Sequence, residues 1–307
     1  MTTPIHHSDP RKGEFTPTSL ETFLQCPRKY YYAKSLQLQA IESSLAAQFG
    51  AAIHEGVACF WKCKGCKTAA EIIEKYWPSY SGKATNNRQE LATLLSVQAF
   101  VDAWSTVKEQ DIKRSNASGI LIMSKYCSTY ERDTSCFLPE NIEVFQPVEM
   151  PNGTMLYSRI DRVKTEGGFH TIVDTKTSSS SLTDYYFRQF ENSFQMSCYF
   201  YIVQQLFGQC DCLQIDAIKV PYTEKEGFVR RSFPRGELQM AEFLSTYRRI
   251  TEQIKEGFSL GEEAQLMFFY QNPTSCGDYG GCKYLSLCKY GLKHPSLGIE
   301  FTRAEAE

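Results

Sequence analysis

The chain has 307 residues, of which 42% are hydrophobic and 22% charged; these proportions are ordinary for a globular enzyme and exclude extensive disorder. The formal net charge of −2 excludes a bulk polycation, so a nucleic-acid partner would need a local basic groove. No apolar run approaches the roughly 18 residues that span a bilayer, and the N-terminus has no hydrophobic signal segment, so we expect a cytoplasmic protein with no membrane partner.

The first part of the chain is predicted to be helical. A capping box that starts at Thr18 opens a helix over residues 18–36, which Pro27 interrupts. A second helix covers residues 45–62, rich in small side chains, and a third covers residues 88–110. The apolar stripe of the third helix is formed by Leu94, Val97, Val101 and Trp104. Residues 115–140 show no steady period and are predicted to be an irregular or short-strand connection.

After this connection the pattern changes to strands joined by tight turns. Hairpin turns at Pro-Asn-Gly and Glu-Gly-Gly separate three predicted strands, which cover residues 142–150, 154–163 and 169–177. The elements expected next are a helix over 190–208, a strand over 213–222, its hairpin partner over 227–234 and a helix over 236–257. We expect one α/β domain over residues 1–307, with a helical elaboration (18–140), an αβ core (141–235) and a C-terminal helix and cysteine segment (236–307).

The stretch TIVDTKTSS raises the question of chemistry. Asp174 and Lys176 are two residues apart and therefore project from the same face of a largely apolar strand. Asp161 lies near the end of the preceding strand, and a short turn between the two strands would bring the charges together. A divalent cation such as Mg²⁺ or Mn²⁺ would neutralise such carboxylates. The alternative is an ordinary ion pair on an exposed strand, which the pair alone would favour.

Asp161 followed at hairpin spacing by Asp174-Thr-Lys176 resembles the signature of the PD-(D/E)XK nuclease superfamily, in its RecB-like branch. Three further stretches are similar to that branch: SLETFLQCPRKYYY, FGAAIHEGV around His54, and Gln195-Met-Ser-Cys-Tyr199. The resemblance implies a restriction-endonuclease-like core with a mixed central sheet. Two positions depart from the usual pattern, since Ser158 replaces a glycine and Thr175 stands before the lysine.

The resemblance also implies roles for individual residues. His54, Asp161, Asp174 and the backbone carbonyl of Thr175 would ligate Mg²⁺ or Mn²⁺, and Lys176 would position or activate the attacking water. A lone histidine in such a helix is otherwise more often a packing residue. The remaining catalytic candidates are Glu143, preferred over Glu149 as the further acidic residue, and Gln195 and Tyr199, which would approach the active site and the DNA backbone. Candidates for a basic and aromatic single-strand groove are Arg28, Lys29, Tyr30, Arg162, Arg188 and Arg230, each of which alone reads as a scattered surface residue.

The C-terminal cysteines form a second motif. Cys276, Cys282 and Cys288, together with the distant Cys26, resemble the iron–sulfur staple of AddB-type nucleases and of the CRISPR-adaptation nuclease family. This resemblance implies a structural [4Fe–4S] cluster and so a cysteine-ligated clip between the chain ends, with Zn²⁺ as the alternative metal. The first gap of the triplet has five residues, where many members have two.

A different cysteine motif, CFWKCKGC over residues 59–66, fits the spacing of radical-SAM enzymes. The aromatic residue usual before its last cysteine is replaced by Gly65, and the strand and helix alternation of a barrel is absent, so we disfavour that alternative.

The expected function is therefore that of a Mg²⁺- or Mn²⁺-dependent deoxyribonuclease, an exonuclease that hydrolyses single-stranded DNA or DNA ends in repair or recombination. The sequence has no Walker A motif, so a helicase or recombination partner would supply any motor. The alternative from another class is a non-catalytic module that binds DNA ends. The intact set of Asp161, Asp174 and Lys176 argues against it.

Overall fold

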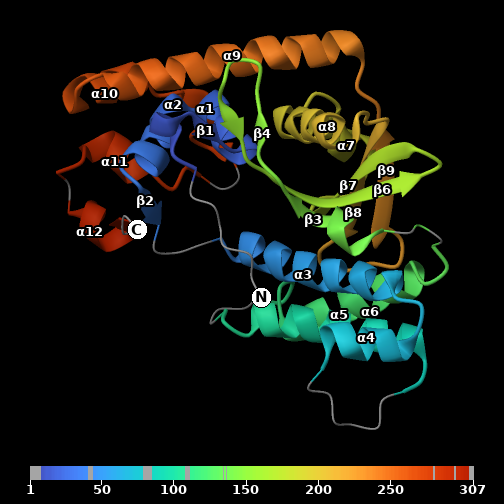
Figure 1. The fold of residues 1–307 in the computed structure, drawn as a ribbon. Coiled ribbons are helices and arrows are strands. Elements are labelled where there is room, and N and C mark those ends of the chain that lie inside the picture. The colour runs from blue at the N-terminus through green and yellow to red at the C-terminus, as the bar shows by residue number, and fades with distance from the viewer. Residues whose placement is uncertain are drawn as a thin grey trace. The chain divides into compact units, whose positions relative to one another are not determined.

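A computed structural model describes residues 8–40, 44–78, 85–107, 111–133, 135, 137–278, 281–293 and 295–303. The chain divides into two compact units (Figure 1). Unit 1 comprises Met1–Ser43, Gln146–Ser158 and Gly236–Glu307, and unit 2 comprises Ser44–Phe145 and Arg159–Arg235. The single domain expected from the sequence stays a prediction. Within the described residues, no helix is long and apolar enough to cross a membrane.

Unit 2 is built on a five-stranded mixed sheet in the order β3-β6-β7-β8-β9. Its strands are β3 (Ile142–Phe145), β6 (Arg159–Glu166), β7 (Phe169–Ser178), β8 (Cys212–Lys219) and β9 (Phe228–Phe233). The β7–β8 pair is parallel and the other three pairs are antiparallel. The hairpin between β6 and β7 turns at Gly167 and Gly168, whose positive φ angles of 58° and 87° suit glycine. The mixed sheet of the α/β expectation is confirmed.

Helices cover both faces of this sheet (Figure 1). One face carries α3 (Leu45–Gly65), with α4 (Ala69–Tyr76), α5 (Arg88–Trp104) and α6 (Asn116–Thr129) packed around it. The other carries α7 (Asp184–Glu191) and α8 (Phe194–Phe207), which form the crossover between the parallel strands β7 and β8. The sequence predicted one helix over 190–208; the chain instead breaks at Asn192 and restarts behind the Ser193 cap, whose hydroxyl accepts from the Met196 N–H.

A hydrophobic core of unit 2 lies between α3, α5, α6 and the sheet. Phe49 packs edge-on against Phe100 and Trp104, with ring centroids 5.6 and 5.1 Å apart. Gly119 of α6 lets that helix approach α5 closely, since a Cβ there would lie only 1.8 Å from Phe100 Cζ. Gly56, one of the small residues noted over 45–62, likewise permits close packing of α3 against α5, since a Cβ there would lie 2.9 Å from the Ser96 carbonyl oxygen.

Two sequence predictions in this region were wrong. Residues 116–129 form α6 rather than an irregular connection, and Ser115 caps it by accepting from the Ser118 N–H. The helical spacing of its buried residues was obscured because Ile120 and Leu121 add apolar side chains on the exposed side. On α5 the buried stripe includes Leu91 and Leu95, whereas Leu94 is 52% exposed. The stretch 108–110, predicted to end that helix, lies outside the described residues.

Unit 1 combines short strands with helices from both ends of the chain. Its sheets are β1 (Glu14–Phe15), β5 (Met155–Leu156) and β4 (Val148–Glu149) in the order β1-β5-β4, and β10 (Phe301–Arg303) paired with β2 (Leu38–Ala40). Its longer helices are α1 (Pro17–Gln25), α9 (Glu237–Ser259) and α10 (Glu262–Phe268). Shorter helical segments are Pro10–Lys12, α2 (Pro27–Tyr30), a π-helix (Tyr31–Ser35), Pro273–Ser275, α11 (Leu285–Tyr290) and α12 (Ser296–Glu300).

The start of α1 corrects the predicted cap. Thr16, not Thr18, is the N-cap: its hydroxyl accepts from the Ser19 N–H, and the Ser19 hydroxyl accepts from the Thr16 N–H. The helix ends at Cys26, before Pro27, as the sequence predicted. The strands predicted over 142–150 and 154–163 are likewise each split, because residues 146–158 leave the sheet of unit 2 and pair in unit 1.

Candidate active site

Three acidic residues lie at one level of the unit 2 sheet. Ile142 pairs with Arg162 and Val144 with Ile160, so Glu143 of β3 lies opposite Asp161 of β6. The β6–β7 ladder ends at the pair Arg162–Val173, and Asp161 and Asp174 follow at the next level, where the two strands diverge. The sequence placed both aspartates near strand ends. Asp161 in fact lies near the start of β6, and the antiparallel hairpin brings that start beside the later part of β7.

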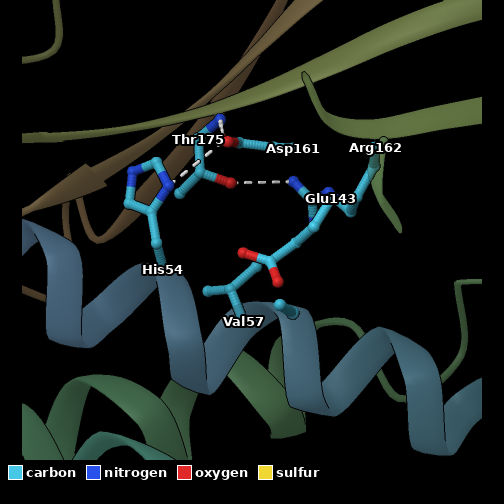
Figure 2. A pocket seen from close by; sticks show the side chains of 7 residues that line it. His54, Val57, Glu143, Asp161, Arg162 and Thr175 are labelled. Atoms are coloured by element: carbon cyan, nitrogen blue, oxygen red, sulfur yellow. Dashed lines mark hydrogen bonds and ion pairs between the residues drawn. The ribbon is translucent and has the colours of Figure 1, made fainter. Parts of the chain in front are cut away.

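Helix α3 brings His54 to this point of the sheet. His54 Nδ1 lies 3.3 Å from Asp161 Oδ2, and the backbone N–H of Thr175 donates to the same oxygen at 2.7 Å. Figure 2 shows His54 projecting from α3 toward Asp161 and Thr175. Gly50, one turn before His54, allows this approach, because a Cβ there would lie 3.0 Å from Thr177 Oγ1 on β7. Packing of α3 against β7 therefore positions the histidine.

Asp174 and Lys176 form an ion pair beside Asp161. Lys176 Nζ lies 2.6 Å from Asp174 Oδ2, and the angles of this contact do not meet those of a hydrogen bond, so this buried oxygen has none within the described residues. The Asp174 side chain is almost fully buried, whereas that of Lys176 is 28% exposed. The same-face placement predicted from their spacing is confirmed, and the exposed surface pair considered as the alternative is excluded by the burial of Asp174.

The charges of this site shift one another's pKa. Burial raises the pKa of Asp174, and the nearby Asp161 carboxylate raises it further against the opposing effect of Lys176. Burial also acts on Asp161, but the His54 and Lys176 charges outweigh it and hold the Asp161 pKa well below its usual range. For His54, burial lowers the pKa and the Asp161 carboxylate more than offsets this, so the net shift is upward. The shifts show that these groups form one electrostatic unit.

Glu143 faces a small cavity next to these residues. The cavity has a volume of about 10 Å³, room for one water-sized group, and is lined by His54, Val57, Ala58, Glu143, Asp161, Arg162 and Thr175. Glu143 has a φ of 55°, a left-handed conformation that side chains other than glycine rarely adopt and that concentrates at functional sites. Its carboxylate lies 3.6 Å from Lys62 Nζ of α3. Glu149, the other acidic candidate, lies in a different sheet, on β4 of unit 1.

The donor set fits a hard divalent cation. Carboxylates, an imidazole and a backbone carbonyl are ligands that Mg²⁺ and Mn²⁺ accept, and the buried Asp174 oxygen with its raised pKa would be stabilised by added positive charge. Among the described residues, however, no three His, Cys, Asp or Glu side chains lie close enough to hold an ion together. Asp161 is instead paired with His54, and Asp174 with Lys176.

The two candidates on α8 lie in the helix that covers the other sheet face. Tyr199 is buried and Gln195 is half-buried, four residues apart on the same side of α8, which packs against β7 and β8. Their roles toward a substrate stay a prediction.

Four of the six residues predicted to line a single-strand groove are buried or bound within their own unit. Tyr30 is fully buried, and Arg28 donates from Nε to the Phe269 carbonyl at 2.7 Å, so both are structural in unit 1. Arg162 is buried and bound to Asp216, and Arg230 is bound to Asp216 and Asp133. Lys29 is half-buried and bonds to Gln25; Arg188 of α7 is exposed. From the sequence alone, an arginine that binds a partner on a neighbouring strand looks the same as an arginine on the surface.

The sequence also gave no indication of how Asp216 is bound. Its carboxylate is fully buried and accepts from Arg162 Nη2 at 2.9 Å, from the Tyr126 hydroxyl at 2.6 Å and from Arg230 Nε at 3.2 Å. Arg230 in turn contacts Asp133 at 2.5 Å. The buried Arg162–Asp216 pair is therefore joined by the partly exposed pair of Arg230 and Asp133, so that two guanidinium groups balance two carboxylates. A single Asp in the apolar run LQIDAIKV of β8 was the available signal for a buried charge.

The four C-terminal and N-terminal cysteines lie in one region of unit 1. The Asn272 N–H donates to Cys26 Sγ at 3.4 Å, Cys276 Sγ donates to the Asn272 carbonyl at 3.9 Å, and the Cys282 N–H donates to the Cys276 carbonyl at 2.9 Å. Burial raises the pKa of Cys288, with further contributions from Cys282 and Cys26. Their side chains are not among any group of three metal ligands in the described residues.

The radical-SAM spacing falls in a packed helix. Cys59 and Cys63 lie within α3, and Cys66 follows its end; Cys63 and Cys66 are buried in the core of unit 2. The mixed five-stranded sheet is not the barrel that such an enzyme requires.

Comparison with known proteins identifies the family of the chain. Residues 14–289 match the PD-(D/E)XK nuclease superfamily, and the chain belongs to that superfamily. Among solved structures, a Eubacterium rectale protein described as a "Putative exonuclease" is similar, with a TM-score of 0.48. The two sequences are 15% identical, and the match covers 80% of this chain and 83% of the other. At this level the likeness carries no functional argument. No curated protein matches the chain.

Proposed function

We propose that the chain is a Mg²⁺- or Mn²⁺-dependent deoxyribonuclease that acts as an exonuclease on single-stranded DNA or DNA ends. One observation carries the proposal: the diverging ends of β6 and β7 place Asp161 with His54, and Asp174 with Lys176, as one coupled group of charges. Membership of the nuclease superfamily supports the reaction class. The proposed preference for single strands or DNA ends rests on the sequence resemblance. The same resemblance is the basis for the proposed link to repair, recombination and a helicase partner.

In this proposal each residue has a defined task. Asp161 and Asp174, with His54 and the Thr175 carbonyl, would hold the cation, with Glu143 as a further acidic contact. A bound Mg²⁺ or Mn²⁺ would lower the pKa of water and stabilise the charge on the phosphodiester. Lys176 would orient the attacking water and hold a positive charge near the scissile phosphate, which its raised pKa favours. Gln195 and Tyr199 would contact the DNA backbone.

The test compares wild type with Asp174→Asn and Lys176→Met on end-labelled single-stranded and double-stranded DNA in Mn²⁺. We expect nucleotide release by wild type, strongest on single strands, and loss of at least about 100-fold in either variant with the far-ultraviolet circular dichroism unchanged. Tyr185→Phe, on the exposed side of α7, is the matched control and should retain activity. Release that survives both substitutions, or DNA binding by a wild type that never cleaves, would favour the non-catalytic end-binding alternative.

For unit 1 we propose that Cys26, Cys276, Cys282 and Cys288 bind a structural [4Fe–4S] cluster, with Zn²⁺ as the alternative. The contacts of Cys26 and Cys276 with Asn272 support it, because residues from opposite ends of the chain lie in one region. Anaerobic purification should give a brown protein with about four irons per chain, and Cys282→Ser should lose them. Cys210→Ser, a buried cysteine of unit 2, is the control. A colourless protein with stoichiometric zinc would replace iron by the alternative.

A further inference from the structure

Two consecutive residues of β6 both contact Thr175. The Asp161 carboxylate accepts from the Thr175 N–H at 2.7 Å, and Arg162 Nη2 donates to Thr175 Oγ1 at 3.0 Å. The carboxylate thus holds the backbone of Thr175 and the guanidinium holds its side chain, and both groups line the cavity beside Thr175. Figure 2 shows the Asp161 carboxylate next to the Thr175 backbone nitrogen and the Arg162 guanidinium pointing toward the Thr175 hydroxyl.

The two contacts occur where the backbone ladder no longer fixes Thr175 on the β6 side. The last ladder pair between β6 and β7 is Arg162–Val173, and the strands diverge beyond it. On its other side Thr175 is still paired with Asp216 of β8. The side chains of Asp161 and Arg162 therefore replace the missing ladder contacts at the residue whose carbonyl is proposed to hold the cation.

Arg162 is itself held rigidly. Its side chain is 1% exposed; Nη1 donates to the Tyr126 hydroxyl at 3.1 Å and Nη2 to Asp216 at 2.9 Å. Asp216 is paired across the sheet with Arg230, which also donates to it. Arg162, Thr175, Asp216 and Arg230 thus form a row across four neighbouring strands, on the face covered by α3 and α6.

We propose that Arg162 is a positioning residue, which sets the Thr175 carbonyl and the Asp161 carboxylate for cation binding through its hydrogen bond to Thr175 Oγ1. The inference rests on the proposed function, since it concerns the same site. Residues that orient metal ligands through hydrogen bonds typically change affinity about 10- to 100-fold when removed. A residue that only fills the core would change stability and leave the cation affinity of the folded protein unaltered.

The decisive variant is Thr175→Val, because it removes the hydroxyl while it keeps the backbone carbonyl, the N–H and the side-chain shape. Arg162 then retains Asp216 and Tyr126, so the buried charges stay paired. Thr175→Ser restores the hydroxyl, and Thr171→Val, earlier on the same strand, is the matched control. Arg162→Met removes the whole contact, but its effect on folding makes it the secondary variant.

The affinity for Mn²⁺ is measured directly by electron paramagnetic resonance of the free ion, alongside the Mn²⁺ concentration that gives half-maximal DNA cleavage. We expect Thr175→Val to weaken both about 10- to 100-fold, with Thr175→Ser and Thr171→Val within about threefold of wild type. The inference is overturned if Thr175→Val binds Mn²⁺ like wild type, or if Thr175→Ser is as weak as Thr175→Val. A wild type that binds no Mn²⁺ and cleaves no DNA overturns the proposed function, and the inference with it.

Discussion

Replacement of Asp216 by asparagine tests how much the buried charge row contributes to the stability of unit 2. Asp216 is fully buried and accepts hydrogen bonds from Arg162, Tyr126 and Arg230 at 2.6 to 3.2 Å. With asparagine, the buried Arg162 guanidinium loses its carboxylate partner, while the partly exposed Arg230 keeps Asp133. Removal of one partner from a buried pair costs about 3–5 kcal/mol, because the remaining charge stays desolvated and unpaired.

The assay is guanidinium unfolding at pH 7, followed by tryptophan fluorescence, to which Trp61 contributes with its ring 5.5 Å from both Arg162 Cζ and Arg230 Cζ. We expect the free energy of unfolding to fall by about 3–5 kcal/mol in Asp216→Asn. Glu71→Gln is the control, since it removes the same charge from an exposed pair with Lys75 on α4 and should shift the midpoint far less. Equal shifts in the two variants would refute the argument that burial determines the cost.

Three further predictions follow from other contacts. The Asp133 pKa is lowered to about 2 because its hydrogen bonds and ion pair outweigh burial. Its contribution to stability is therefore complete above the unfolded pKa of 3.8 and is lost as the pH falls toward 2. Acid unfolding of Asp133→Asn should show a shallower dependence of the unfolding free energy on pH across that interval, and an unchanged slope would contradict the argument. Gly119→Ala should destabilise the protein by about 1–3 kcal/mol through the clash with Phe100, and the loss should shrink in a Phe100→Leu background; the same loss in both backgrounds would rule out the clash. Gly50→Ala should lower DNA cleavage about 3- to 10-fold by moving α3 off β7, with recovery when Thr177→Ala is added; no recovery would show that the two side chains do not compete for space.

Local sequence rules predicted the elements whose signals lie within a few residues. The turn glycines predicted the β6–β7 hairpin, and the two-residue spacing of Asp174 and Lys176 predicted that their side chains share a face. Helix α6 was missed because apolar side chains on two sides of a helix erase the period on which the prediction depends.

The interactions that depend on non-local pairing were beyond such rules. Arg162 looked like a DNA contact because its partners lie on β8 and α6, 54 and 36 residues away in sequence. His54 could be assigned to the site only through the resemblance, because packing of α3, and not sequence spacing, brings it to Asp161. The positive φ of Glu143 likewise arises from tertiary structure and leaves no mark in the sequence.

The alternation of Asp161 and Arg162 on β6 also limits how this chain can change in length. Deletion or insertion of a single residue just before them would turn the carboxylate into the core and the guanidinium toward the cation site, so catalysis and folding would fail together. A substitution changes only one of the two side chains, whereas a shift of one residue displaces both at once. Evolutionary or engineered insertions are therefore expected to accumulate in the loops that leave this strand, and never within it.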